Sequence, residues 1–329
     1  MMIRRALFNT LLIAALYIAA LGALLWYAHT SIKKESQKQA EYILENTALR
    51  TDNLLTEVET VTRNFEWLVT NNMHPDSLLE YSNRIVELNP NLNGCSITTE
   101  PNFFPKLGRD FSAYTVRHND TIETVMEGEY DYYSKDWYKN PREAGKSVWV
   151  DPYDDFNEAG TLYSTDMIAS YSLPLYNADS TFIGVISTDL SLPKLSESIT
   201  DELPYEGSYY MMTGKSGNFL MYPDKDRLIY HTIFDGVNPR MHPDIISLGH
   251  NMTEGKKGSM SVNFEGVNCL VSYQPLSKAG WSIALVCPEK SMMGNFSSFV
   301  YITIALLLAG ILMLLYYHRR HITNHQAES

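Results

Sequence analysis

Cysteine is scarce in this chain, which has three among 329 residues, so a small fold held together by disulfides is excluded. Positive charge is also in deficit, with 26 Lys and Arg against 38 Asp and Glu and a formal net charge of −12. Proteins that bind nucleic acid need a basic surface for the phosphates, so a general nucleic-acid binder is excluded as well.

Recognisable catalytic motifs are missing too. Gly214-Lys215-Ser216 resembles the end of a P-loop but lacks the upstream glycine spacing, and there is no G-x-S-x-G or H-E-x-x-H pattern. His318, His321 and His325 have helical spacing, which is more typical of polar residues flanking a membrane span than of a metal site. We therefore expect no enzymatic activity in this polypeptide, no cofactor and no metal ion.

Two long apolar runs are present. Residues 6–28 and residues 299–317 carry no charged side chain, and the first run, 23 residues at 1.5 Å each, is long enough to cross a hydrocarbon core of about 30 Å. A cleaved signal peptide has a shorter apolar core of about 7 to 15 residues. The first run also ends on Trp26 and Tyr27, which suit a membrane interface. We predict two transmembrane helices in a lipid bilayer.

Basic residues flank these runs on their outer sides. Arg4 and Arg5 precede the first run, and Arg319 and Arg320 follow the second. The positive-inside rule then predicts a two-pass protein of the plasma (inner) membrane, with residues 1–5 and 318–329 in the cytoplasm and residues 29–298 outside. Only four of the 26 basic and one of the 38 acidic residues lie outside this exported segment, so its formal charge is −15.

A heptad-like spacing follows the first run and predicts a long stalk helix over residues 29–72. The repeated 4,3 spacing is formed by Ala40, Leu44, Thr47, Thr51, Leu54, Val58, Val61, Phe65 and Leu68. Such a stripe fits a parallel homodimer or an amphipathic helix that packs on its own domain, and both interpretations remain open.

In the rest of the exported segment, sequence patterns typical of helices alternate with patterns typical of strands. A short helix over residues 75–88 leads into strands such as 96–99, 112–118, 164–176 and 181–192, and a second series runs from 208 to 288. Helices followed by consecutive antiparallel strands, given twice, predict an α+β fold of two tandem units, 73–200 and 201–297.

The order of these features resembles the double-Cache (PAS-like) sensor module of bacterial transmembrane receptors. The resemblance covers residues 30–297 and rests on Trp137-Tyr138, Pro152-Tyr153-Asp154-Asp155, IGVISTDLSL at 183–192, TGKSGNFLMYPDKD at 213–226 and LVSYQPLSKAGWSIALV at 270–286. It implies a membrane-distal Cache unit that binds a ligand and a membrane-proximal unit that relays the change.

A cluster of aromatic and acidic residues is the candidate ligand site. Flat rings and carboxylates suit a small amine, amino acid or zwitterion, because an ammonium group stacks on a ring and donates to a carboxylate. From the residues and the resemblance together, the candidates are Tyr130, Lys135, Trp137, Tyr138, Trp149, Tyr153, Asp155 and Asp189.

In amino-acid-binding Cache modules the resemblance assigns the ligand carboxylate to a basic residue at position 135 and the ligand amino group to Asp189. This sequence has Lys135 where that pattern has Arg, and lysine cannot form the planar bidentate clamp, so a small amine or a small carboxylate remains open. The alternative for Trp137 and Tyr138 is an ordinary place in the core, for Lys135 a solvated charge, and for Asp155 and its acidic neighbours a turn around Pro152.

The cysteines allow two arrangements. Cys269 and Cys287 lie symmetrically about Lys278 in a hairpin, so they either form a cross-strand disulfide or remain two buried thiols.

We therefore expect a membrane-anchored sensor that binds a small molecule and relays it across the membrane, as a homodimer and with a cytoplasmic signalling partner. One alternative is the input half of a longer signalling enzyme, such as a histidine kinase, nucleotide cyclase, chemoreceptor or PP2C-type phosphatase. Another is an exported interaction or scaffold protein that uses the fold without sensing.

Overall fold

The computed structural model describes residues 2–118, 121–128, 131–154, 164, 166–200, 203–294 and 296–327. It is 48% helical and 27% strand, which confirms the α+β class. The chain divides into two compact units. The first consists of Met1–Ala40, Tyr205–Gly207 and Cys287–Ser329, and the second of Glu41–Pro204 and Ser208–Val286.

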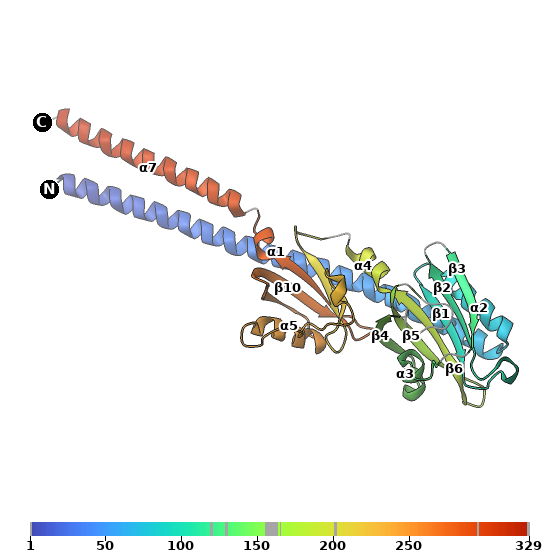
Figure 1. Ribbon diagram of the computed structural model, residues 1–329. Coiled ribbons are helices and arrows are strands. Elements are labelled where there is room, and N and C mark those ends of the chain that lie inside the picture. The colour runs from blue at the N-terminus through green and yellow to red at the C-terminus, as the bar shows by residue number, and fades with distance from the viewer. Residues whose placement is uncertain are drawn as a thin grey trace. The chain divides into compact units, whose positions relative to one another are not determined.

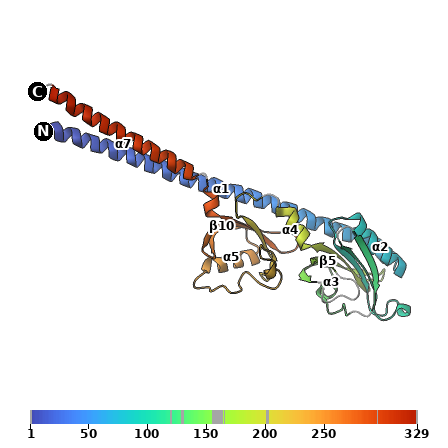
Figure 2. The same cartoon turned by 45° about the horizontal axis from the view of Figure 1, so that its top comes forward.

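The first unit is dominated by two helices that are long and apolar enough to cross a membrane (Figures 1 and 2). They are the N-terminal part of α1 (Met2–Asn71) and α7 (Phe296–Ala327), and the apolar side chains along both are exposed. The Tyr17 hydroxyl of α1 donates to the Leu306 carbonyl of α7 at 2.6 Å. A Cβ at Gly310 would run into the Tyr17 ring, so glycine at this position permits the close approach.

The second unit contains two antiparallel sheets, and the six-stranded sheet comes first along the chain. Its strand order is β3 (Thr121–Glu127), β2 (Ser112–His118), β1 (Gly94–Thr99), β6 (Phe182–Ser191), β5 (Met167–Tyr176) and β4 (Val148–Asp154). The helices of this half are α2 (Pro75–Leu88), α3 (Asp136–Ala144), α4 (Leu192–Thr200) and the short η1 (Pro105–Leu107).

Alternation along the strands gives the six-stranded sheet two different faces. One face packs on α1 and α2: the Ser82 hydroxyl of α2 bonds to Thr115, and Thr62 of α1 lies 2.6 Å from Thr188 on β6. The other face carries Asp189, one residue further along β6, and is covered by α3. The candidate ligand site belongs to this second face.

The five-stranded sheet has the order β8 (Phe219–Met221), β7 (Tyr209–Thr213), β11 (Ser282–Pro288), β10 (Val267–Pro275) and β9 (Gly258–Phe264). Its other elements are η2 (Lys225–Arg227), α5 (Pro243–Thr253) and α6 (Glu289–Met292). One sheet face packs on α5 in an apolar core that includes Leu248, Val271 and Ala284, all fully buried.

The stalk stripe is largely used within the chain itself. Leu44, Thr47, Thr51 and Val58 are buried, and the Thr47 hydroxyl lies 2.9 Å from that of Tyr210 on β7. The structure therefore favours the interpretation in which the helix packs on its own domain. Three later members of the stripe remain half-buried, namely Val61, Phe65 and Leu68.

Of the two arrangements that the sequence allows for Cys269 and Cys287, the structure contains the buried thiols and not the disulfide. All three cysteines, including Cys95, are buried thiols. Cys269 belongs to the apolar core together with Val286, so its side chain lies on the α5 face of the sheet. Cys287 directly follows Val286 on β11 and points to the opposite face, which separates the two sulfur atoms.

Candidate ligand-binding site

Helix α3 supplies the aromatic part of the site. Its buried residues Trp137, Tyr138 and Pro141 have i, i+1 and i+4 spacing and form one face of the helix. Gly145 ends the helix in the left-handed conformation with φ of 61°, which glycine adopts without strain. Trp137 and Tyr138 join Tyr132 and two sheet residues in a buried cluster. The sheet residues are Val150 on β4 and Val185 on β6, so this cluster lies on the Asp189 face.

Two tyrosines of this cluster are anchored by their hydroxyl groups. The Tyr132 hydroxyl donates to the Thr99 carbonyl at 2.9 Å, and the Tyr138 hydroxyl donates to Glu100 at 2.9 Å. Burial is the main reason that the pKa of Tyr132 is raised to about 12, and burial followed by Glu100 raises the pKa of Tyr138 further. Both groups stay neutral, and the Tyr138 hydroxyl holds α3 at the end of β1.

Trp137 differs from these tyrosines. Its side chain is only 8% exposed, yet its indole N–H donates no hydrogen bond within the described part of the chain. Buried polar groups normally have a partner, so this donor is available to a bound molecule.

The acidic part of the site is built on β6, β5 and β4. Asp189 is 4% exposed, and its Oδ1 accepts a hydrogen bond from the Ser170 hydroxyl at 2.6 Å. The Tyr153 hydroxyl lies 2.9 Å from the same serine oxygen. Asp189 also pairs in register with Gly94 on β1, where a Cβ would lie 2.7 Å from Oδ2. Glycine at position 94 therefore makes the space that the carboxylate occupies.

The sheet around Asp189 is unusually polar for a buried surface. Ser96 on β1, Ser187 on β6 and Ser172 on β5 are paired across the strands and lie on the same face as Asp189. The hydroxyls of Ser172 and Ser187 are 2.9 Å apart, whereas Ser96, 7% exposed, makes no side-chain hydrogen bond among the described residues. This face therefore offers hydroxyls, a carboxylate and an indole donor at one place.

The corresponding face of the five-stranded sheet is lined differently. It is filled by apolar side chains of the sheet and of α5, such as Met211, Val262 and Met252. Tyr209 packs against this core, and burial strongly raises the pKa of its hydroxyl. The α3 face of the six-stranded sheet is thus polar, whereas the α5 face of the five-stranded sheet is apolar.

The structure brings together four of the predicted residues: Trp137, Tyr138, Tyr153 and Asp189 lie on the α3 side of the six-stranded sheet. Lys135 directly precedes α3 and is half-buried. Two further predicted residues, Tyr130 and Asp155, lie outside the described residues.

Trp149 lies on the opposite side of the sheet from these residues. It pairs with Tyr171 on β5, and its indole N–H donates to Glu59 of α1 at 3.0 Å. One position along β4 changes the face of the sheet, so Val150 points into the site and Trp149 away from it. The proposed pocket therefore omits Trp149.

The serines and Gly94 are functional-site residues that were not predicted from the sequence. Their signal is the alternation of Ser170 and Ser172 on one strand and of Ser187, Asp189 and Ser191 on the next. Polar residues at every second position of an otherwise apolar strand indicate a polar buried face. No group of three or more His, Cys, Asp or Glu able to hold a metal occurs among the residues that the structure describes.

The model of the Cache domain family matches residues 27–296. The chain belongs to the Cache domain family. Its fold is similar to the extracellular domain of mmHK1S-Z2, which is assigned as a histidine kinase, with 20% identity, a TM-score of 0.64 and coverage of 78% of this chain and 99% of that one.

Two chemoreceptor domains have the same fold. The periplasmic sensory domain of Campylobacter jejuni Tlp1 is 12% identical, with a TM-score of 0.63 and coverage of 80% of this chain and 98% of that one. The ligand-binding domain of Pseudomonas aeruginosa PAO1 amino acid chemoreceptor PctB, in complex with L-Arg, is 18% identical, with a TM-score of 0.55 and coverage of 77% and 97%. This Cache protein is thus a sensor-type domain flanked by two candidate membrane helices.

Proposed function

We propose that the protein is a transmembrane receptor that binds a small ligand carrying an ammonium group on the Asp189 face of the six-stranded sheet. The observation that carries this proposal is the polar buried face itself, with Asp189 set among serine hydroxyls. A carboxylate in such a place stabilises a cation, and the same face of the other sheet has no equivalent among its described core residues.

The two ends of the site select different groups of the ligand. Asp189 accepts the ammonium protons, and the rings of Trp137 and Tyr153 border it. The free indole N–H of Trp137 and the ammonium of Lys135 suit a ligand carboxylate. An amino acid uses both ends, a simple amine uses only the first, and a small carboxylate uses only the second.

Three related molecules separate these ligand classes. Valine has both groups, isobutylamine is valine without its carboxylate, and isovalerate is valine without its amino group. Calorimetry on the full chain in nanodiscs should show binding of valine or isobutylamine. Replacing Lys135 with methionine should weaken the binding of valine and leave the binding of isobutylamine unchanged. The proposal is wrong if neither ammonium compound nor a wider amine and amino-acid panel binds, or if Trp137→Ala and Asp189→Ala leave the affinity of a bound ligand intact.

Strand β4 is the proposed route from this site to the second sheet. Val150 and Tyr153 face the site, while Asp151 accepts a hydrogen bond from the Trp281 indole at 3.1 Å. The Trp281 ring also lies 5.7 Å from that of Trp149. A ligand that moves β4 therefore acts directly on Trp281, which is fully buried at the start of the β11 hairpin arm.

Glu59 of α1 joins the same junction. It accepts from Trp149 at 3.0 Å and lies 3.8 Å from the ammonium of Lys278 in the hairpin loop. Hydrogen exchange would test this route: ligand should change protection in β10 and β11, and Trp281→Phe should abolish that change while the dissociation constant stays within about twofold. An unchanged response in Trp281→Phe would exclude this route.

The membrane arrangement and assembly complete the proposal. Both termini face the cytoplasm, where an output domain or partner reads the signal, and the half-buried Val61, Phe65 and Leu68 with the exposed Trp67 form a homodimer contact. Reporter fusions at each end test the topology, and an opposite localisation of either terminus would contradict it. Cross-linking through Trp67→Cys tests the dimer, which is refuted if only monomers are recovered from membranes.

A further inference from the structure

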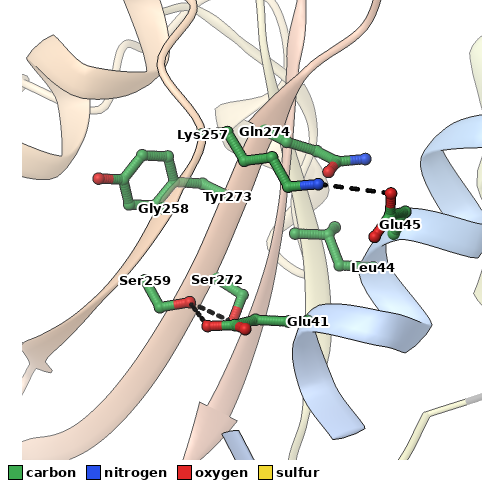
Figure 3. Close-up of a pocket in the computed structure, with 9 residues that line it drawn as sticks. All are labelled: Glu41, Leu44, Glu45, Lys257, Gly258, Ser259, Ser272, Tyr273 and Gln274. Carbon is green, nitrogen blue, oxygen red and sulfur yellow. Dashed lines mark hydrogen bonds and ion pairs between the residues drawn. The ribbon is translucent and has the colours of Figure 1, made fainter. Parts of the chain in front are cut away.

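A cavity lies in the five-stranded half, away from Asp189. It has a volume of about 260 Å³ and lies between α1 and strands β9 and β10 (Figure 3). Helix α1 contributes Glu41, Leu44 and Glu45, and the strands contribute polar side chains on the sheet face opposite to the α5 core.

The most informative lining residue is Gln274 on β10. Its side chain is only 8% exposed, and its amide points toward α1 (Figure 3). The amide makes no hydrogen bond to any residue within the described ranges. The amide opens onto the cavity, so its two donor hydrogens and its acceptor oxygen are available to a bound molecule or to water.

The rest of the lining is ordered by hydrogen bonds. The Ser259 hydroxyl donates to Glu41 at 2.7 Å and lies 3.0 Å from the hydroxyl of Ser272. Across the opening, the Lys257 ammonium lies 3.5 Å from Glu45. Because Lys257 and Glu45 are both more than half exposed, this ion pair is weak and a competing cation can replace the lysine.

The charge of the lining determines the class of ligand. Two glutamates and one lysine give the cavity a net charge of −1 when they are ionised. A ligand with a single positive charge neutralises it, whereas an anion meets two carboxylates. An ammonium between Glu41 and Glu45 and a hydroxyl or amide at the other end of the molecule would also satisfy the Gln274 amide.

We propose that this cavity is a second ligand site, separate from the Asp189 site, and that it takes a small organic monocation. The ammonium group binds between Glu41 and Glu45, and a polar group at the far end of the ligand bonds to Gln274. Since the glutamates lie on α1 and the amide on β10, a bound molecule ties the stalk helix to the second sheet.

The probe is 5-amino-1-pentanol, compared with pentane-1,5-diol, which is neutral, and 5-hydroxypentanoate, which is an anion. Calorimetry on the full chain in nanodiscs is expected to show binding of the amine alone. The Asp189→Asn variant should retain this binding, which separates the second site from the first. Loss of the amine signal in Asp189→Asn, or equal binding of the diol, would overturn the proposal.

Variants with opposite expected effects test the assigned residues. Glu45→Gln should weaken the binding of the amine about five- to tenfold. Gln274→Leu should weaken it to the same extent without altering the charge of the cavity. Lys257→Met should strengthen it about threefold, because the competing ammonium is removed. The matched control is Glu66→Gln, a glutamate on the same helix but 21 residues, or about 32 Å, further along. Unchanged affinity in Glu45→Gln and Lys257→Met would refute the site.

Discussion

Asp189→Asn is the sharpest test of the first ligand site. Asparagine has the same shape as aspartate, and its side-chain oxygen can still accept the hydrogen bond that Ser170 donates at 2.6 Å. The substitution leaves no cavity beside Gly94, so the fold should survive with little change in thermal midpoint. The substitution removes the negative charge and turns one acceptor oxygen into an amide donor, in a side chain that is 4% exposed.

The magnitude follows from this burial. Removing one member of a buried, hydrogen-bonded charge pair costs about 2 to 5 kcal/mol of binding free energy, of which at least about 2 kcal/mol applies here. Since about 1.4 kcal/mol is a factor of ten, the dissociation constant of an ammonium ligand should rise at least about 30-fold. This dissociation constant is measured by calorimetry on the full chain in nanodiscs.

The matched control is Asp244→Asn. Asp244 accepts a hydrogen bond of the same length, 2.6 Å, from the backbone N–H of Asn263 in the five-stranded half. The Asp244→Asn variant should leave the affinity for the ammonium ligand unchanged. A rise of less than threefold in Asp189→Asn, with the ligand still bound, would refute the role of the carboxylate.

Three further predictions concern stability and thiol chemistry. Because the pKa of Tyr132 is raised from 10.0 to about 12, its folded form keeps a proton that the unfolded form loses; the thermal midpoint should therefore fall between pH 10 and 12, and fall less in Tyr132→Phe, whereas equal slopes would contradict this. Thr62→Val leaves the buried hydroxyl of Thr188 without the partner at 2.6 Å and should cost about 1 to 3 kcal/mol in denaturant unfolding. Adding Thr188→Val should recover part of that loss, and a further loss of similar size would argue against the pair. Peptides from the unreduced protein should show Cys269 and Cys287 unlinked by mass spectrometry, and a linked pair would contradict the structure.

The sequence was most informative where its signal is local. Uncharged runs at 6–28 and 299–317 correspond to the two helices that are long and apolar enough to cross a bilayer, because length and apolarity are read directly from the sequence. The helix at 75–88 appears where proline begins it and apolar spacing repeats, and it coincides with α2. The order of motifs identified the Cache family, which the match over residues 27–296 shows.

The site could be anticipated only in part. Trp137 and Tyr138 are adjacent in a short helix, and Asp189 is a charge in an apolar strand, so each has its own local signal. Trp149 looked equivalent to them in sequence, yet its position on β4 turns it toward α1. The face of a strand residue depends on the pairing register and on the bulge between Val150 and Tyr153, which composition does not reveal.

The sequence by itself determined the two candidate membrane helices, the α+β class, the family and the acidic character of the segment between those helices, because these follow from composition and from patterns within short stretches. The tertiary structure alone decided that the stalk stripe packs on its own sheets, that Cys269 and Cys287 face opposite sides, and that Gln274 lines one cavity with Glu41 and Glu45. Each of these three outcomes depends on which face of a strand packs against which turn of a helix. That choice is made by packing between segments more than 200 residues apart, such as Glu41 and Ser259, and no local pattern encodes it.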